Sequence, residues 1–155
     1  MIKRSAGILV YKIEDNTIKV LLGHMGGPYW QDIENGSWSI PKGEFKSETS
    51  INAAKREFTE ETGLMAPEDL NYLSSKKVSN NKIIIIFYSQ SDYDTNKTTS
   101  NTFTLEWPKG SGIIKEFSEI DKVEWMSIDI AKEKILKNQV YFLNKLEEKL
   151  SGLTS

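Results

Sequence analysis

The sequence predicts a single α+β domain over residues 1–155, in which strand pairs and helices enclose one hydrophobic core. Three observations indicate this class. β-Branched stretches come in pairs around short polar turns, a helical apolar repeat lies between the pairs, and an amphipathic pattern ends the chain. The 155 residues are 38% hydrophobic and 27% charged, a composition typical of a globular domain.

The chain is predicted to begin with a hairpin, whose strands cover residues 5–13 and 17–22 around a polar turn. Residues 23–37 contain four glycines, a proline and two aromatic residues, which is the composition of a loop. A short extended piece is expected at 38–41, with the side chain of Trp38 in the core.

A helix is predicted next, because apolar residues recur at the spacing of one helix face and form an inward stripe, namely Ile51, Ala54 and Phe58. Thr49 or Ser47 is expected to cap its amino end. Gly63 is expected to end the helix, since glycine readily adopts the left-handed conformation found at helix ends.

A second pair of strands is predicted at 70–78 and 82–88. Residues 83–87 are apolar without interruption, which predicts a strand buried on both faces. The polar segment 91–112 is expected to be a long connection, and connections of that length tend to be functional or mobile.

Two further strands are predicted at 113–117 and 122–127. An amphipathic helix at the carboxyl end of the chain is indicated by apolar residues at helical spacing, namely Leu136, Val140, Leu143, Leu146 and Leu150.

Charge and composition exclude several classes of function. The formal net charge is −2, from 20 basic and 22 acidic side chains, which argues against nucleic acid as a partner because such surfaces are normally basic. The absence of cysteine rules out disulfides, thiolate catalysis and cysteine-bound metals. The apolar runs are too short to span a bilayer, and we recognise no signal peptide, so we expect a soluble cytoplasmic protein without a membrane partner.

The most informative feature of the chain is a cluster of carboxylates, because Glu57, Glu60 and Glu61 share one side of the predicted helix. Like charges at this spacing destabilise a bare helix by roughly 0.2–0.5 kcal/mol per pair. On a helical projection the cluster borders the apolar stripe, so the carboxylates flank the core. They are either a solvated acidic face or a site for a hard divalent cation such as Mg²⁺ or Mn²⁺, which prefers oxygen ligands.

A longer pattern around this cluster resembles the signature of the Nudix hydrolases, and its residues are Gly43, Glu48, Arg56, Glu57, Glu60, Glu61, Gly63 and Leu64. The second half of the signature matches at every fixed position. The first half differs by one residue, because four residues separate Gly43 from Glu48 where the signature has five. Such a deletion costs little loop-closure entropy, but we expect it to shift Glu48 relative to the helix start.

The resemblance implies an α/β/α sandwich with a mixed central sheet and the cleavage of a pyrophosphate bond in a nucleoside diphosphate linked to another group. It implies metal binding by Glu57, Glu60, Glu61 and the carbonyl of Gly43, with Arg56 orienting the carboxylates. Glu48 is a further catalytic residue of the signature, and its usual role is the one that the shorter loop would disturb. The sequence looks closest to the branch with diadenosine polyphosphate hydrolases and predicted NTP pyrophosphohydrolases. Homodimers are common in this family.

Some relatives recruit a further carboxylate from a later loop. Glu119 is our first candidate for that role and Glu116 is the second. Two rival functions remain open, namely a non-catalytic protein that senses nucleotides on the same fold, and removal of caps or pyrophosphate from RNA. RNA substrates would favour a basic patch, which this balanced sequence does not contain.

Several other residues have a structural and a functional interpretation. Tyr29 and Trp30 could stack on a nucleobase or fold back onto the core. Trp107 could belong to a lid or a base platform. Contacts with phosphate are considered for Lys42, which could instead be solvated, and also for Arg4 and His24, although a lone histidine is more often structural.

Overall fold

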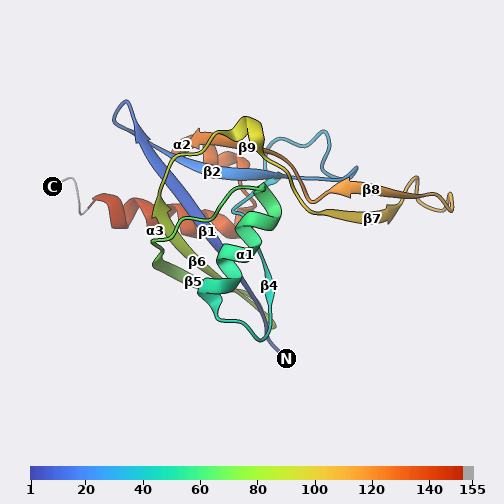
Figure 1. Cartoon of the computed structure of the whole chain (residues 1–155), viewed down its shortest axis with the longest axis horizontal. Coiled ribbons are helices and arrows are strands. Elements are labelled where there is room, and N and C mark those ends of the chain that lie inside the picture. Colours follow the sequence, from blue (N-terminus) through green and yellow to red (C-terminus); the bar gives the residue numbers. More distant parts are fainter. Residues whose placement is uncertain (152–155) are drawn as a thin grey trace.

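The computed structural model describes residues 1–151, so the last four residues of the predicted domain lie outside the described part. The fold is a mixed sheet covered by helices on its two faces, as predicted (Figure 1). Helix α1 (Ser50–Thr62) packs on one face, whereas α2 (Ile128–Lys134) and α3 (Val140–Ser151) contribute to the hydrophobic cluster on the other face.

The main sheet has seven strands, and its central pair β1 and β6 is parallel while the other pairs are antiparallel. The order along the sheet is β3-β2-β1-β6-β5, with β4 paired to β1 and β9 paired to β2. The bounds are β1 Lys3–Glu14, β2 Thr17–Met25, β3 Trp38–Ser39, β4 Lys42–Phe45, β5 Asn71–Ser79, β6 Lys82–Gln90 and β9 Ile120–Ser127.

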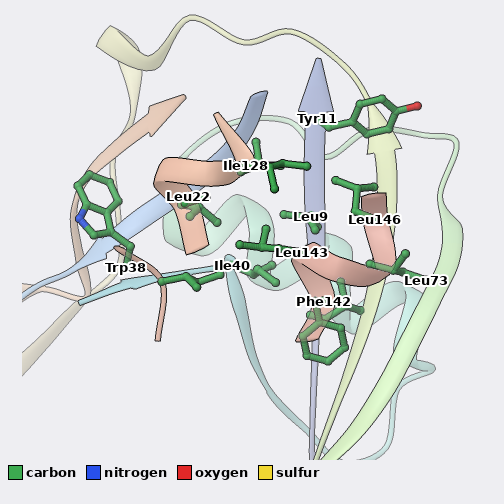
Figure 2. Packing of buried hydrophobic residues seen from close by; sticks show 14 of the residues in the cluster. Leu9, Tyr11, Leu22, Trp38, Ile40, Leu73, Ile128, Phe142, Leu143 and Leu146 are labelled. Atoms are coloured by element: carbon green, nitrogen blue, oxygen red, sulfur yellow. The ribbon is translucent and has the colours of Figure 1, made fainter. Parts of the chain in front are cut away.

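Strand β1 shows why the sheet has two cores. Successive side chains of a strand point to opposite faces. Leu9 and Tyr11 accordingly join the cluster beneath α2 and α3, whereas Ile8 and Val10 join the cluster beneath α1. Figure 2 shows the first cluster, in which Leu9 faces side chains of α3. The predicted burial of Trp38 in this cluster is confirmed.

The predicted hairpin is confirmed, and β1 and β2 are joined by a turn in which Asp15 and Asn16 have φ of 53° and 61°. Positive φ at both central positions is typical of the tight turns that match strand twist, and Asp and Asn tolerate it. The predicted β5–β6 pair is confirmed as well, and β6 is buried on both faces through Ile84 on one side and Phe87 on the other.

Helix α1 begins and ends where the sequence indicates. The hydroxyl of Thr49 accepts a hydrogen bond from the backbone N–H of Asn52 at 3.2 Å, so Thr49 is the cap of the two candidates. Gly63 follows the helix with φ of 74°, and its N–H bonds the carbonyl of Thr59. The predicted inward stripe is wrong at one position, because Ile51 is exposed and the buried face runs through the two alanines at 53 and 54.

Two elements differ from the sequence prediction. The segment 91–112 is not a plain connection, because it contains the short helix η1 (Thr95–Lys97) and strand β7 (Thr102–Glu106). Strand β7 pairs with β8 (Ile114–Ser118) in a separate two-stranded sheet that extends from the body of the molecule (Figure 1). The predicted strand at 113–117 therefore exists but lies outside the main sheet.

The carboxyl-terminal region holds more helix than the apolar pattern predicts. Helix α2 follows β9 directly, and the hydroxyl of Ser127 caps it. The predicted terminal helix begins at Val140 rather than near Leu136, which precedes the short helix η2 (Lys137–Gln139). Among residues 1–151, no helix is both long and apolar enough to cross a membrane.

Candidate functional site

The predicted carboxylate cluster lies where α1 meets β4 and the start of β9. Glu57 and Glu61 are buried, with 9% and 8% of their surface exposed, and Glu60 is half-buried beside them. Glu119 stands before β9, close enough to raise the pKa of both buried carboxyls through its charge. The fold thus brings the first candidate from the later loop to the helix carboxylates, as the sequence predicts for its position.

Burial and mutual repulsion determine the protonation of this cluster. Burial, followed by the charge of Glu57, raises the pKa of Glu61 from its ordinary 4.5 to about 8. Burial likewise raises the pKa of Glu57, although hydrogen bonds from Arg56 oppose the shift. Partial burial and the charge of Glu60 raise the pKa of Glu119. Full ionisation of the cluster is therefore unfavourable in these surroundings, and a bound cation would favour it.

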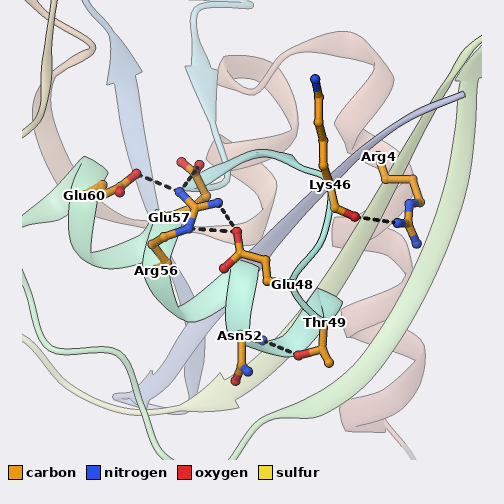
Figure 3. Close-up of polar contacts among 8 residues, drawn as sticks. All are labelled: Arg4, Lys46, Glu48, Thr49, Asn52, Arg56, Glu57 and Glu60. Atoms are coloured by element: carbon orange, nitrogen blue, oxygen red, sulfur yellow. Dashed lines mark hydrogen bonds and ion pairs between the residues drawn. The ribbon is translucent and has the colours of Figure 1, made fainter. Parts of the chain in front are cut away.

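Arg56 connects the cluster to the loop before α1 (Figure 3). One nitrogen, Nη1, donates to Glu57 at 2.8 Å and to Glu60 at 3.0 Å, whereas Nε donates to Glu48 at 2.9 Å. The hydrogen bonds from Arg56 lower the pKa of the Glu48 carboxyl. The loop that is one residue shorter than the Nudix signature therefore still delivers Glu48 to Arg56.

Gly43 lets strand β4 approach the cluster. A Cβ atom at this position would overlap the carboxylate of Glu57, so only glycine permits the observed contact. The neighbouring Lys42 is half-buried near Glu61, and both its charge and its backbone oppose the rise in the pKa of that carboxyl. Burial, followed by the charge of Lys82, lowers the pKa of Lys42, so the solvated interpretation of this lysine does not describe its surroundings.

A cavity of about 240 Å³, which we call the central cavity, opens beside the cluster. The lining includes the charged residues Lys42, Glu61 and Glu119 and the aromatic residues Trp30 and Phe103. Gly27 lies next to Phe103, because an added Cβ would come within 2.8 Å of the Phe103 ring. The full lining consists of Met25, Gly26, Trp30, Ser39, Lys42, Glu61, Phe103, Glu119 and Ile120.

The β7–β8 hairpin is anchored to the carboxyl end of α1. The backbone N–H of Asn101 donates to the carbonyl of Glu60 at 2.8 Å, and Glu119 N–H donates to the carbonyl of Asn101 at 2.8 Å. These bonds place Phe103 and Glu119 near the helix carboxylates. Sequence reasoning missed Phe103, and its only local signal is the alternation of Phe103 and Leu105 with polar residues.

Four other predicted site residues do not line the central cavity, namely Tyr29, Trp107, Arg4 and Glu116. Tyr29 is 59% exposed and forms an edge-on contact with Trp107 at 5.3 Å between ring centroids, so neither folds into the core. Arg4 lies outside the central cavity, over the ring of Phe45. Glu116 is exposed on β8 and does not line the cavity.

His24 has a structural position. It is 2% exposed, its Nδ1 lies 2.8 Å from the carboxylate of Asp121, and its Nε2 lies 2.8 Å from the carbonyl oxygen of Ile33. Both ring nitrogens thus have protein partners, and the side chain fastens the loop after β2 to β9. This arrangement supports the structural interpretation of the histidine.

The residues present fit a hard divalent cation. Such ions take carboxylate and carbonyl oxygens, and the cluster offers these from Glu57, Glu60, Glu61 and the backbone at Gly43. The raised pKa of Glu61 and the close approach at Gly43 both indicate a place where positive charge is favourable. Among the described residues, no three Asp, Glu or His side chains form a ready-made metal cage, and Arg56 holds two of the carboxylates.

Comparison with known proteins gives a consistent result. The family model described as "NUDIX domain" matches residues 1–146. No curated protein matches the sequence. Among solved structures, the NUDIX domain of Shewanella oneidensis NrtR with ADP ribose aligns with a TM-score of 0.68 at 14% identity, covering 97% of this chain and 89% of that one.

Two further structures show the same fold. The Caenorhabditis elegans Ap4A hydrolase binary complex aligns with a TM-score of 0.65 at 18% identity, covering 97% of this chain and 99% of that one. A mutT/nudix family protein from Listeria innocua gives 0.67 at 16% identity, with 98% and 96% covered. Because the family model spans nearly the whole chain and its signature residues meet at one site, this chain belongs to the Nudix hydrolase family.

Proposed function

We propose that this chain is a divalent-metal-dependent pyrophosphohydrolase that cleaves a nucleoside diphosphate linked to a further group. The observation that carries the proposal is the meeting of the helix carboxylates, Gly43 and Glu119 beside a cavity lined by both charged and aromatic side chains. Acidic groups alone would repel a phosphate. The combination therefore favours a site that binds phosphate together with a cation.

The cation would be held by Glu57, Glu60, Glu61 and the carbonyl of Gly43, with Mg²⁺ or Mn²⁺ matching these ligands. When bound, it would supply charge neutralisation for the pyrophosphate and a lowered pKa for a water molecule. Arg56 would keep the carboxylates in position, because it already bonds Glu57 and Glu60. These roles match those that the family signature implies.

Other residues of the site would act on the substrate and on the attacking water. Lys42 lines the central cavity, where its ammonium group would contact a phosphate oxygen. Glu119, an exposed residue that lines the same cavity, would accept a proton from water as it attacks phosphorus. The raised pKa of this carboxyl favours proton acceptance over that of an ordinary surface glutamate.

The aromatic residues of the central cavity would bind the base. Trp30 comes from the loop after β2 and Phe103 from strand β7, and both line the cavity. Stacking of a base on an aromatic side chain contributes about 1–3 kcal/mol. The cavity volume of about 240 Å³ suits one base better than a whole dinucleotide.

A second candidate is nucleotide sensing without cleavage. One specific observation favours it, namely the similarity to the NUDIX domain of NrtR, which was crystallised with ADP ribose, and to NrtR with a 27mer DNA. Against it stands the complete set of Glu57, Glu60 and Glu61, since binding a nucleotide does not require all three carboxylates.

Product analysis separates the two candidates. The protein would be incubated with NTPs, dinucleoside polyphosphates, ADP-ribose and nucleotide sugars in Mg²⁺, in Mn²⁺ or in EDTA, and the phosphate products measured. We expect cleavage of at least one class that stops in EDTA. Tight binding of a nucleotide without cleavage in any metal would replace the hydrolase proposal with the sensing function.

A further inference from the structure

A short segment that leads from η1 into β7, residues 99–101, is bonded to the end of helix α1, and we call it the linking segment. The backbone N–H of Thr99 donates to the carbonyl of Thr62 at 2.9 Å. The backbone N–H of Asn101 donates to the carbonyl of Glu60 at 2.8 Å. The last carbonyls of a helix lack partners within the helix, so they are available for such bonds. The linking segment therefore has a fixed position relative to the carboxylates of α1.

Gly63, which follows α1, makes this close contact possible. A Cβ at Gly63 would overlap Oγ1 of Thr99 and lie 2.9 Å from the backbone nitrogen of the same residue. No side chain fits in this space, so the linking segment can approach the end of the helix only because glycine stands at this position.

The linking segment also holds the backbone on both sides of Glu119. The hydroxyl of Ser100 accepts the N–H of Ile120 at 3.0 Å and donates to the carbonyl of Asn101 at 2.9 Å. The same carbonyl accepts the N–H of Glu119 at 2.8 Å. The carbonyl of Glu119 in turn accepts the N–H of Gly26 at 2.8 Å. Three backbone polar groups at and directly after Glu119 therefore have partners.

The carboxylate of Glu119 has no such support of its own. Within residues 1–151 its side chain forms no hydrogen bond and no ion pair, although it lines the central cavity. Its position therefore depends on the backbone that carries it. Among the described residues, the hydroxyl of Ser100 is the side-chain partner of that backbone, whereas the other bonds join backbone groups and survive a substitution.

We propose that Ser100 is a positioning residue for Glu119, and that it holds the backbone so that the carboxylate can accept a proton from the attacking water. The inference rests on the proposed function, in which Glu119 accepts that proton. Proton transfer depends steeply on geometry, and a displacement on the order of 1 Å can slow a reaction about 100-fold. Ser100 does not line the central cavity, so it would act on turnover and not on substrate binding.

The test measures kcat and KM of Ser100→Ala in Mg²⁺. ATP, diadenosine tetraphosphate, ADP-ribose and UDP-glucose are the probes, and the one that the unmodified protein cleaves fastest is used for the variants. Ser100→Thr keeps the hydroxyl. Thr98→Val is the matched control, because the Thr98 hydroxyl donates to the carbonyl of Thr95 at 3.3 Å within the same connection and does not bond the backbone around Glu119.

We expect Ser100→Ala to lower kcat by about tenfold or more and to change KM by less than about twofold, as for other residues that orient a reacting group. Ser100→Thr should retain most of the turnover, and Thr98→Val should leave kcat unchanged. Thermal unfolding checks that each variant is folded. An unchanged kcat in Ser100→Ala would overturn the inference while leaving hydrolysis intact.

A double-mutant cycle with Glu119→Gln separates positioning from a general structural effect. If Ser100 acts through Glu119, its substitution has little to disturb once the carboxylate is gone. We therefore expect Ser100→Ala to lower kcat by less than about twofold in the Glu119→Gln protein. An equal fall in both backgrounds would show that Ser100 supports the site in general, and would overturn its assignment to Glu119.

Amide hydrogen exchange measures the same support without turnover. The N–H of Ile120 loses its acceptor in Ser100→Ala, so it should exchange about tenfold faster than in the unmodified protein, while amides in the middle of α1 stay unchanged. Unchanged exchange at Ile120 would overturn the inference even if kcat falls. A protein that cleaves none of the four probes would refute the proposed function, and the catalytic role of Ser100 with it.

Discussion

Replacing the buried carboxyl of Glu61 by an amide is expected to stabilise the metal-free protein at pH 8, although it removes a metal ligand. The pKa of Glu61 is raised from its ordinary 4.5 to about 8 in the folded state, with burial as the main cause. One pKa unit corresponds to about 1.4 kcal/mol, so at pH 7 the raised pKa lowers the free energy of unfolding by on the order of 3 kcal/mol. In Glu61→Gln that cost is absent.

The sign follows from the two pKa values. Below pH 4.5 the carboxyl is protonated in both states and costs nothing. As the pH rises to about 8, the unfolded chain ionises first, so the free energy of unfolding falls through this range and then levels off. A neutral amide at the same place does not ionise, so the free energy of unfolding of Glu61→Gln has no such dependence on pH.

The assay is urea unfolding in EDTA at pH 5 and pH 8, followed by circular dichroism. We expect the free energy of unfolding of Glu61→Gln to exceed that of the unmodified protein by about 4 kcal/mol at pH 8 and by less than about 1 kcal/mol at pH 5. Glu68→Gln, at an exposed position shortly after α1, serves as the control. A variant that is less stable at pH 8, or that keeps the original pH dependence, would refute the argument from burial.

Addition of Mg²⁺ completes this experiment. A cation that binds only the folded state stabilises it by mass action. Because Glu61 is one of the proposed ligands, the unmodified protein should gain stability and Glu61→Gln should gain little. An equal gain in both proteins would place the cation elsewhere.

Two further substitutions test the close contacts of the site. Gly43→Ala places a Cβ onto the carboxylate of Glu57, so calorimetry should show Mg²⁺ affinity reduced by about tenfold or more, and unchanged affinity would contradict the role of the close approach. His24→Ala removes a buried ring together with its contacts to Asp121 and to the carbonyl of Ile33, so thermal unfolding should show a loss of about 1–3 kcal/mol. A loss below 0.5 kcal/mol would contradict the structural role of the histidine.

The sequence predicts the parts of the fold that local chemistry determines. Helix α1 carries its own cap at Thr49 and its own end at Gly63, and the first hairpin has a turn of Asp15 and Asn16 that suits tight strand connections. Alternation and unbroken apolar runs identify the strands of the main sheet. The orientation of Ile51 is harder to predict from local chemistry, because Ile51 lies in the first turn of α1, where its side chain is exposed.

The parts that were missed depend on contacts between distant residues. Strand β7 lies in a polar segment, and its pairing with β8 comes from a register that no local signal specifies. Helix α2 has seven residues, too few for a convincing apolar period, and it is held by the burial of Ile128 and Ala131.

The candidate site divides in the same way. The carboxylates are evident from their spacing on one helix, because that helix alone brings them together. Glu119 was a candidate from its place in the chain, whereas Phe103 reaches the central cavity only because the start of β7 is bonded to the end of α1.

The most direct test of the account is the turnover of Glu60→Gln on whichever substrate the unmodified protein cleaves. Glu60 is half-buried beside the core, so its replacement should leave thermal unfolding almost unchanged while it removes a proposed ligand. We predict that metal-dependent turnover falls by about 100-fold or more, and that Glu68→Gln retains it. Full metal-dependent turnover in a folded Glu60→Gln protein would contradict the assignment of the helix carboxylates.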